Sequence, residues 1–450
     1  MSTRWGNLQR TVLWLSLLWP LGSAALEVPP TLLQILPPEP LVQSTLQESL
    51  ALQSASAGVD RALAEAALRR RGPHEASVNA EWLRRDVDQE GRFGEWNVGM
   101  SKAIRWPDKR AIDQATATRM TELAHAAAED VRHQVAMDLL QTWMQWRVAN
   151  ELVQSALTRE EASQREWQAI DARWRVGQAS AAERDALTQL LAEVRAETLV
   201  VQQRQQAAEA QLRLRYPRLI PVLSESLSAL PAPENLPAPP GGWWTVVEQH
   251  SHELEVLRQR AAIADLESDR QAAERHPDPT LGFRVLSERD GAERGVGLTL
   301  SIPLGTVRRG LQAQQAAAAA AELGASVQAE IREMKLALAQ REQAAAALWQ
   351  QWQAWQDAAI AAESRATRLS TGWALGEVSF DVLVQARRSA AEARTREIEA
   401  RASVHAANAG LFLDAHGFWL DRPSHASHET VDEAAVQMDV DEPLTARLTD

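Results

Sequence analysis

The sequence predicts a mainly α-helical, internally duplicated chain. Its long helices would form a coiled-coil barrel, and its four strands would join those of two further copies in a small β-barrel. Three observations support this fold class. Two stretches of 67 residues, 110–176 and 309–375, contain no proline and few glycines, and helical sequence of this length is typical of coiled coils. Segment 295–304, GVGLTLSIPL, alternates apolar with small or polar residues, as a strand does. Landmarks of the first half recur 198 or 199 residues later.

The composition excludes several classes of protein. The 450 residues carry a formal net charge of −13, which disfavours nucleic acid as a partner because phosphate binding requires a basic surface. The chain has no cysteine, so disulfides, zinc–thiolate sites and thiol nucleophiles are excluded. No glycine-rich phosphate loop, nucleophile elbow or His-Glu-x-x-His motif occurs. The sequence therefore predicts a protein that is not an enzyme, with no catalytic residue, no cofactor and no metal site.

The N-terminus has the features of a secretory signal peptide over residues 1–25. Arg4 and Arg10 give it a positive start, and an apolar core follows at 11–22. Small residues after this core suit cleavage before Leu26. A single anchoring helix is the alternative, although the core is short for one. No later stretch of about 18 apolar residues occurs, so an exported chain of this kind would meet a membrane only through β-structure.

Two pairs of landmarks indicate an internal duplication. NVGMSKAI at 97–104 matches 295–302 at an offset of 198. VGQAS at 176–180 matches LGEVS at 375–379 at an offset of 199. Chance is a poor explanation for two landmarks that keep nearly the same spacing in both halves. The Pro-rich segment 230–242 would join the halves, because it suits neither a helix nor a central strand.

The domain boundaries follow from this duplication. The end of the chain differs in composition, because it carries eight acids against two arginines, which indicates a flexible acidic tail. The predicted domains are a signal peptide at 1–25, a first structural repeat at 26–229, a Pro-rich linker at 230–242, a second repeat at 243–420 and the acidic tail at 421–450.

Each half is expected to contain the same elements in the same order: a helix, two strands joined by a polar turn, a very long helix and a returning helix. An Asp-Gly pair in the second hairpin indicates a tight turn, and each long helix would extend roughly 100 Å at about 1.5 Å per residue. The expected elements of the first half are Leu46–Arg70, Ser77–Arg84, Glu95–Ile104, Arg110–Val176 and Gln178–Arg215. Their counterparts are Thr245–Glu274, Thr280–Leu286, Gly295–Ile302, Arg309–Leu375 and Glu377–Ala409.

The strands pose a packing problem that several copies would solve together. Four strands cannot close a barrel, for which about eight is the usual minimum, and an open sheet would leave exposed edges and an exposed apolar face. Three chains would give twelve strands, within the range of outer-membrane barrels. Apolar side chains would then face lipid, and small polar ones a watery lumen. The predicted lipid-facing residues are Val98, Met100, Ile104, Val296, Leu298, Leu300 and Ile302. A soluble sheet packed on helices is the alternative.

The chain resembles the TolC-type outer membrane efflux proteins, or outer membrane factors, over roughly residues 43–413. VGLTLSIPLGTVRRG at 296–310 resembles the strand-to-helix junction of that family. RWRVGQAS at 173–180 and STGWALGEVSFDVL at 370–383 resemble its two helix-turn tips. The resemblance implies a homotrimer with a twelve-stranded transmembrane β-barrel in the outer membrane and a helical tunnel in the periplasm.

The resemblance also implies roles for the turns at the inner end of the tunnel. In the family these turns meet a periplasmic adaptor protein, and the residues that match are Val176, Gly177, Gln178, Ser180, Leu375, Gly376, Glu377 and Ser379. Glycine suits a tight turn, and a serine three residues later suits the cap of the returning helix. Acidic residues just past the second tip narrow the family's channels, and Asp381 is the match here, with Glu377 at the turn itself; Val384 or Gln385 stands where a second acid often lies. Solvated helix acids are the alternative interpretation.

The predicted function is that of an outer-membrane channel in a tripartite efflux pump, with an inner-membrane pump and a periplasmic adaptor as partners. The chain is also similar to the outer-membrane partners of heavy-metal exporters of the cobalt–zinc–cadmium type, which would imply metal cations as substrate. A periplasmic adaptor protein and a soluble periplasmic coiled-coil scaffold are the alternatives. Adaptors have one helical hairpin where this sequence has two, and a scaffold does not explain the duplicated strands.

Overall fold

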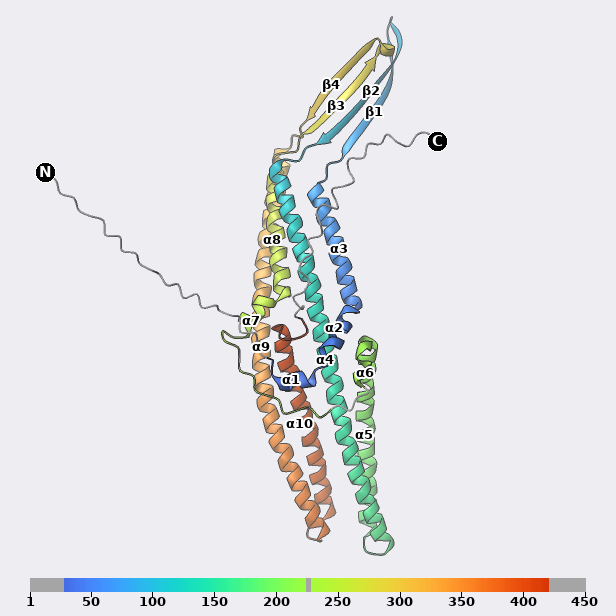
Figure 1. Ribbon diagram of the computed structural model, residues 1–450, viewed down its shortest axis with the longest axis vertical. Coiled ribbons are helices and arrows are strands. Elements are labelled where there is room, and N and C mark those ends of the chain that lie inside the picture. Colours follow the sequence, from blue (N-terminus) through green and yellow to red (C-terminus); the bar gives the residue numbers. More distant parts are fainter. Residues whose placement is uncertain (1–27, 224–227, 421–450) are drawn as a thin grey trace, which may run out of the picture.

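The structure, a computed structural model, describes residues 28–223 and 228–420. The expected signal peptide at 1–25, the cleavage site before Leu26 and the expected acidic tail at 421–450 lie outside the described residues. The described chain is an elongated rod, with a β-sheet at one end and two helix-turn tips at the other (Figure 1). A mainly helical fold with a small four-stranded sheet is confirmed.

Each half consists of helices and one β-hairpin. The first half comprises α1 (Pro30–Ile35), α2 (Glu39–Gln47), α3 (Leu50–Arg71), β1 (Ala76–Val87), β2 (Gly91–Ala103), α4 (Pro107–Arg175), α5 (Ala181–Arg215), the 3-10 turn η1 (Pro217–Leu219) and α6 (Ile220–Leu223). The second half comprises α7 (Trp243–His250), α8 (His252–Ala273), β3 (Thr280–Glu288), η2 (Arg289–Gly291), β4 (Glu293–Ser301), α9 (Thr306–Ala374) and α10 (Phe380–Asp414). Within the described ranges, no helix has an apolar stretch long enough to cross a membrane.

Corresponding helices of the two halves have the same lengths. α4 and α9 each have 69 residues, α5 and α10 each have 35, and α3 and α8 each have 22. A duplicated sequence would give this equality, because the residues that end a helix would recur at a fixed offset. The boundaries of the two sequence repeats stay a prediction.

The first helix of each half differs from expectation. The sequence predicts one helix over 46–70, whereas α2 ends at Gln47 and α3 begins at Leu50. It likewise predicts one helix over 245–274, whereas Ser251 separates α7 from α8. The Ser251 hydroxyl accepts a hydrogen bond from the N–H of Leu254 at 3.1 Å. Ser251 therefore caps a new helix, a position that serine favours.

The four strands form one antiparallel sheet in the order β1-β2-β3-β4. β2 pairs with β3, so the sheet joins the two halves, with Val98 opposite Val285. Within the described residues β1 and β4 each pair on one side only. Because side chains alternate between faces along a strand, this register gathers the apolar residues of all four strands on one face. That apolar face comprises Val78, Ala80, Trp82, Trp96, Val98, Met100, Leu281, Phe283, Val285, Val296, Leu298 and Leu300.

The main hydrophobic core lies near the middle of the rod, where α1, α2 and the end of α10 pack around α4 (Figure 1). Trp143 of α4 is almost fully buried there, and its indole N–H donates to the carbonyl of Ile35 at 2.7 Å. The linker 230–242 forms neither helix nor strand. It is held against α10 by Arg401, which donates to the carbonyl of Leu230 at 2.6 Å.

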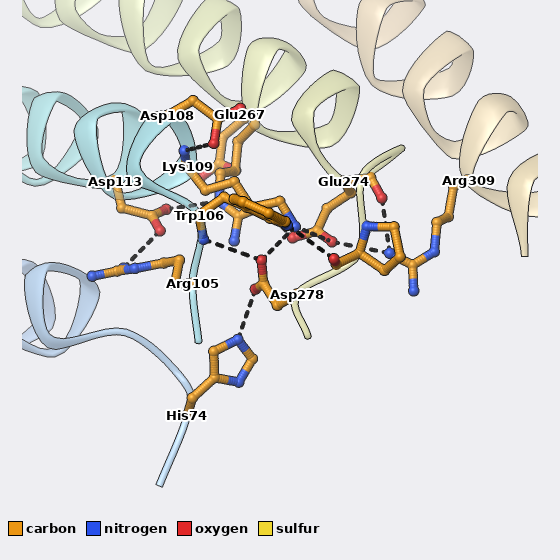
Figure 2. Close-up of polar contacts among 12 residues, drawn as sticks. His74, Arg105, Trp106, Asp108, Lys109, Asp113, Glu267, Glu274, Asp278 and Arg309 are labelled. Atoms are coloured by element: carbon orange, nitrogen blue, oxygen red, sulfur yellow. Dashed lines mark hydrogen bonds and ion pairs between the residues drawn. The ribbon is translucent and has the colours of Figure 1, made fainter. Parts of the chain in front are cut away.

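A network of ion pairs between side chains connects the helices at the end of the sheet nearest to them (Figure 2). Asp113 of α4 accepts hydrogen bonds from three guanidinium groups, those of Arg69 (2.7 Å), Arg105 (2.8 Å) and Arg270 (3.1 Å). The Lys109 ammonium is fully buried and lies 3.0 Å from the carboxylates of both Glu274 and Asp278. The network connects α3, α4 and α8 beside the ends of the strands nearest the helices, so it holds the helices together where the sheet begins.

We expect Asp113→Asn to destabilise the fold strongly. The neutral amide would leave three largely buried guanidinium groups without their shared carboxylate, and breaking a buried ion pair costs about 3–5 kcal/mol. Asp86→Asn is the matched control, since Asp86 and its partner Arg92 are both exposed and such pairs contribute about 0–1 kcal/mol. Thermal unfolding of both variants measures the difference. Equal effects of the two substitutions would contradict this role of Asp113.

Candidate functional site

Two tight turns close the end of the rod opposite the sheet (Figure 1). They join α4 to α5 and α9 to α10. Gly177 and Gly376 hold the same place in the two turns, with φ angles of 74° and 79°, a conformation that glycine adopts without steric cost. Each glycine N–H donates to the carbonyl three residues earlier, that of Trp174 at 2.9 Å or Trp373 at 3.0 Å. These bonds satisfy carbonyls that a helix end would otherwise leave free.

The two serines of these turns differ in what they do. The Ser180 hydroxyl accepts from the Glu183 N–H at 3.1 Å, and the Glu183 carboxylate accepts from the Ser180 N–H at 3.0 Å. These reciprocal bonds form a capping box, and the bond from the Ser180 N–H holds the pKa of Glu183 below its ordinary value. Ser379 makes no capping bond with its side chain, so the expected second cap is absent. Val382 stands where a glutamate closes the box in the first tip.

All eight predicted adaptor-contacting residues lie in or beside these turns, and all are exposed. They are Val176, Gly177, Gln178 and Ser180 in the first tip and Leu375, Gly376, Glu377 and Ser379 in the second. Val176 is 68% exposed and Leu375 is 70% exposed. Each tip therefore presents one apolar side chain to its surroundings, and contact with an adaptor stays a prediction.

Ion pairs and a small core hold the two hairpins together near the tips. Apolar side chains of both hairpins share one buried cluster. Arg387 of α10 pairs with Glu166 of α4, and Arg388 of α10 pairs with Glu193 of α5. Both pairs connect the second hairpin to the first, so they oppose separation of the tips.

The predicted pore constriction lies at the second tip. The side chains of Asp381 and Glu377 are exposed, and neither forms an ion pair with any described residue. A ring of carboxylates would require several copies of these residues around one axis. The constriction therefore stays a prediction.

The seven predicted lipid-facing residues lie along one face of the sheet, and all are exposed. Five belong to β2 and β4, whereas Ile104 and Ile302 each follow the last residue of their strand. Leu298 is 87% exposed. No described helix covers either face of the sheet (Figure 1), so a sheet packed on helices is wrong for the part of the chain that the structure describes. The sequence reasoning missed the apolar residues of β1 and β3, such as Trp82 and Phe283, although they show the same alternation.

A cluster of four histidines near the middle of the rod was not predicted. The ring of His416, in the turn after α10, lies 5.1 Å from that of His252, 5.6 Å from that of His250 and 6.1 Å from that of His133, between centroids. The rings come from three distant segments, so no local spacing signals the cluster. Burial, with the neighbouring histidines, lowers the pKa of His416 to about 4, and burial also lowers the pKa of His252.

The surroundings of this cluster are mostly acidic. Burial raises the pKa of Asp130 and of Glu253, and an Asp414 carboxylate oxygen lies 3.3 Å from His133 Nε2. Among residues 28–223 and 228–420, no three His, Cys, Asp or Glu side chains are arranged to hold a metal ion.

Comparisons with known proteins identify the fold. No protein-family model matches the sequence, and no curated protein matches it. The outer membrane protein VceC of Vibrio cholerae is 15% identical, with 83% of this chain and 95% of that chain covered and a TM-score of 0.68. A membrane protein of Pseudomonas aeruginosa is 16% identical, with 86% and 94% covered and a TM-score of 0.71. The open MtrE outer membrane channel of Neisseria gonorrhoeae is 17% identical, with 87% and 91% covered and a TM-score of 0.65. At these identities the likeness shows a shared fold.

The histidine cluster gives a prediction about pH. We expect a loss of stability as the pH falls from 6.5 towards about 4. In this window a histidine of the unfolded chain binds a proton and His416 in the folded chain does not, so protons favour unfolding. The raised pKa values of Asp130 and Glu253 act in the opposite direction. His416→Asn isolates the contribution of the histidine, because asparagine tolerates the positive φ of 56° found there.

Unfolding temperatures at pH 7 and pH 5 measure this effect. The drop between the two pH values should be smaller for His416→Asn than for the unmodified chain. His125→Asn, at an exposed position of α4, is the control and should leave the drop unchanged. The interpretation is wrong if His416→Asn loses as much stability on acidification as the unmodified chain.

Proposed function

We propose that this chain, which has the fold of the TolC-type outer membrane channels, is the outer-membrane channel of a tripartite efflux pump and acts as a homotrimer. The sheet would lie in the outer membrane, and the helices would form a stem in the periplasm. Substrate would pass from an inner-membrane pump, through a periplasmic adaptor bound at the tips, to the exterior. This role requires positioning and a continuous passage, with no catalytic step.

The open, one-sided sheet is the observation that carries this proposal. Its apolar face is exposed on all four strands, and β1 and β4 leave backbone groups unpaired within the described chain. In hydrocarbon each unpaired group would cost several kcal/mol. Pairing β1 of one copy with β4 of the next would close twelve strands from three copies and remove every edge. The apolar face would then meet lipid, and the polar face would line a lumen.

The helical stem also favours a channel over a periplasmic adaptor or a soluble scaffold. A periplasmic adaptor has one long helical hairpin, whereas this chain has two hairpins of equal length. A soluble scaffold has no use for an apolar sheet face that nothing in the described chain covers. Heavy-metal cations as substrate rest on the sequence resemblance alone.

We expect Leu298→Asp to reduce assembly in the outer membrane. Its carboxylate would face lipid at a cost of up to about 2 kcal/mol in each chain, and a trimer would carry this cost three times. Thr299→Asp is the matched control, because the adjacent residue faces the opposite side of the same strand. The amount of trimer in the outer membrane fraction is the measurement. Equal assembly of the two variants would show that Leu298 does not face lipid.

We also expect the double variant Val176→Asp, Leu375→Asp to assemble normally and to bind adaptor about tenfold more weakly or worse. Both side chains are exposed, so the fold should tolerate the change. An unpaired carboxylate buried in an interface costs about 1–3 kcal/mol. Val176→Leu with Leu375→Val keeps both positions apolar and serves as the control. Cross-linking in cells measures the adaptor recovered per trimer, and unchanged recovery would contradict the assignment of the tips.

A further inference from the structure

The polar face of the sheet has a distinctive pattern of charge. Its three rows nearest the helices contain small or uncharged residues and a single arginine. From the helices outward, these rows are Ala103, Thr280 and Ser301; then Ser77, Ser101, Gly282 and Thr299; then Asn79, Gly99, Arg284 and Gly297. Arg284 is therefore the one charged side chain in this half of the polar face.

Arg284 lies between two glycines on the neighbouring strands, so no side chain stands directly beside it on this face. Gly99 of β2 and Gly297 of β4 are its direct neighbours across the sheet. A Cβ atom at Gly297 would lie 3.4 Å from Arg284 Nε, and one at Gly99 would lie 3.3 Å from Arg284 Cβ. A side chain at Gly99 would therefore be tight against Arg284, whereas one at Gly297 would make ordinary contact with it. Arg284 is exposed, and it makes no hydrogen bond or ion pair with any described residue.

The other charged residues of this face lie nearer the hairpin turns, and most of them have partners. Glu81, one row further out and two strands away, accepts a hydrogen bond from Asn97 at 2.6 Å. Beyond it, Arg85 pairs with Glu95 at 2.6 Å. The remaining acids on this face of the strands are Glu288 and Glu293, the second of which pairs with Arg289 at 3.3 Å. The acids of this face thus begin one row beyond Arg284, and Arg284 is the charge that dominates the three rows nearest the helices.

We propose that Arg284 sets the charge preference of the half of the barrel lumen nearest the helices and favours there the passage of solutes that carry an anionic group, such as a carboxylate or a phosphate. This inference rests on the proposed function, because it requires the polar face to line a lumen. Three copies of Arg284 would then lie at one level, and rings of arginine or lysine are the device by which pores select anions. A metal cation would be repelled at this level, so the ring opposes the heavy-metal substrate that the sequence resemblance suggests.

The physical basis is that no other charged side chain lies in the three strand rows of the polar face nearest the helices. The low-dielectric walls of a narrow passage focus the field of a charged ring and change the local concentration of ions by factors of about 10 to 1000. Small neighbours such as Gly297 leave the guanidinium open to solution, where it can meet a passing solute. An acidic ring at Asp381 or Glu377 would act at the far end of the stem, and its effect would not reach the barrel through many Debye lengths of about 8–10 Å.

The absence of cysteine makes this field measurable. Thr299→Cys places a thiol on the polar face, one row from Arg284, and Leu298→Cys places one on the apolar face. Two membrane-impermeant thiosulfonate reagents are applied to intact cells, one with a sulfonate group and one with a quaternary ammonium group. The readout is the ratio of the anionic to the cationic modification rate at Thr299→Cys, which does not require the tips to be open.

We expect this ratio to fall about tenfold or more when Arg284→Gln is added. Arg284→Lys keeps the charge and should keep the ratio near its starting value. Lys102→Gln removes the same charge from the opposite face of the sheet and should leave the ratio unchanged. A ratio that Arg284→Gln does not alter, with Thr299→Cys still reactive, would overturn the role of Arg284 and leave the channel intact. If neither cysteine reacts, or if Leu298→Cys reacts as fast as Thr299→Cys, the polar face does not line a lumen, and the proposed function fails together with the inference.

Discussion

The four-stranded sheet imposes the constraint on which the rest of the structure depends: the described residues of one chain neither pair its edges nor cover its apolar face. β1 and β4 have free sides within the described residues, and large side chains such as Leu298 and Phe283 stand exposed. Open edges attract further strands, and hydrocarbon tolerates no unpaired backbone. Closure with identical copies would pair these edges, because each copy brings the same two edges to its neighbours, and lipid would cover the apolar face.

The helical part is suited to carry such a sheet at the end of a long support. Both halves supply a 69-residue helix and a 35-residue return, and β2–β3 pairing joins the halves at the sheet. At the base of the strands, Lys109 and Asp113 hold α3, α4 and α8 together through buried ion pairs. At the other end, Arg387 and Arg388 tie the second hairpin to the first. The two ends of the rod therefore differ. Buried ion pairs hold the helices together beside the sheet. At the tips, two ion pairs and a small apolar cluster hold the two hairpins together, and the turns themselves are exposed.

Local patterns predicted much of this architecture. The alternation in 295–304 placed its apolar residues on the correct face, because a period of two leaves only one choice once one face is apolar. Gly177 was predicted in its turn because few other residues accept a positive φ there. What escaped prediction depends on segments far apart in the sequence. The three guanidinium groups around Asp113 and the histidines around His416 meet only when distant helices pack. The break at Ser251 escaped because the residues around it, 248–253, include no glycine or proline to mark a helix end.

The mass and shape of the protein extracted from outer membranes in a mild detergent test the central claim most directly. Closure of the sheet among copies predicts a mass of three chains, and electron microscopy should show an elongated particle with a short detergent-covered end and a long bare stem. A water-soluble monomer or dimer, or a particle without a detergent-covered end, would contradict the shared barrel.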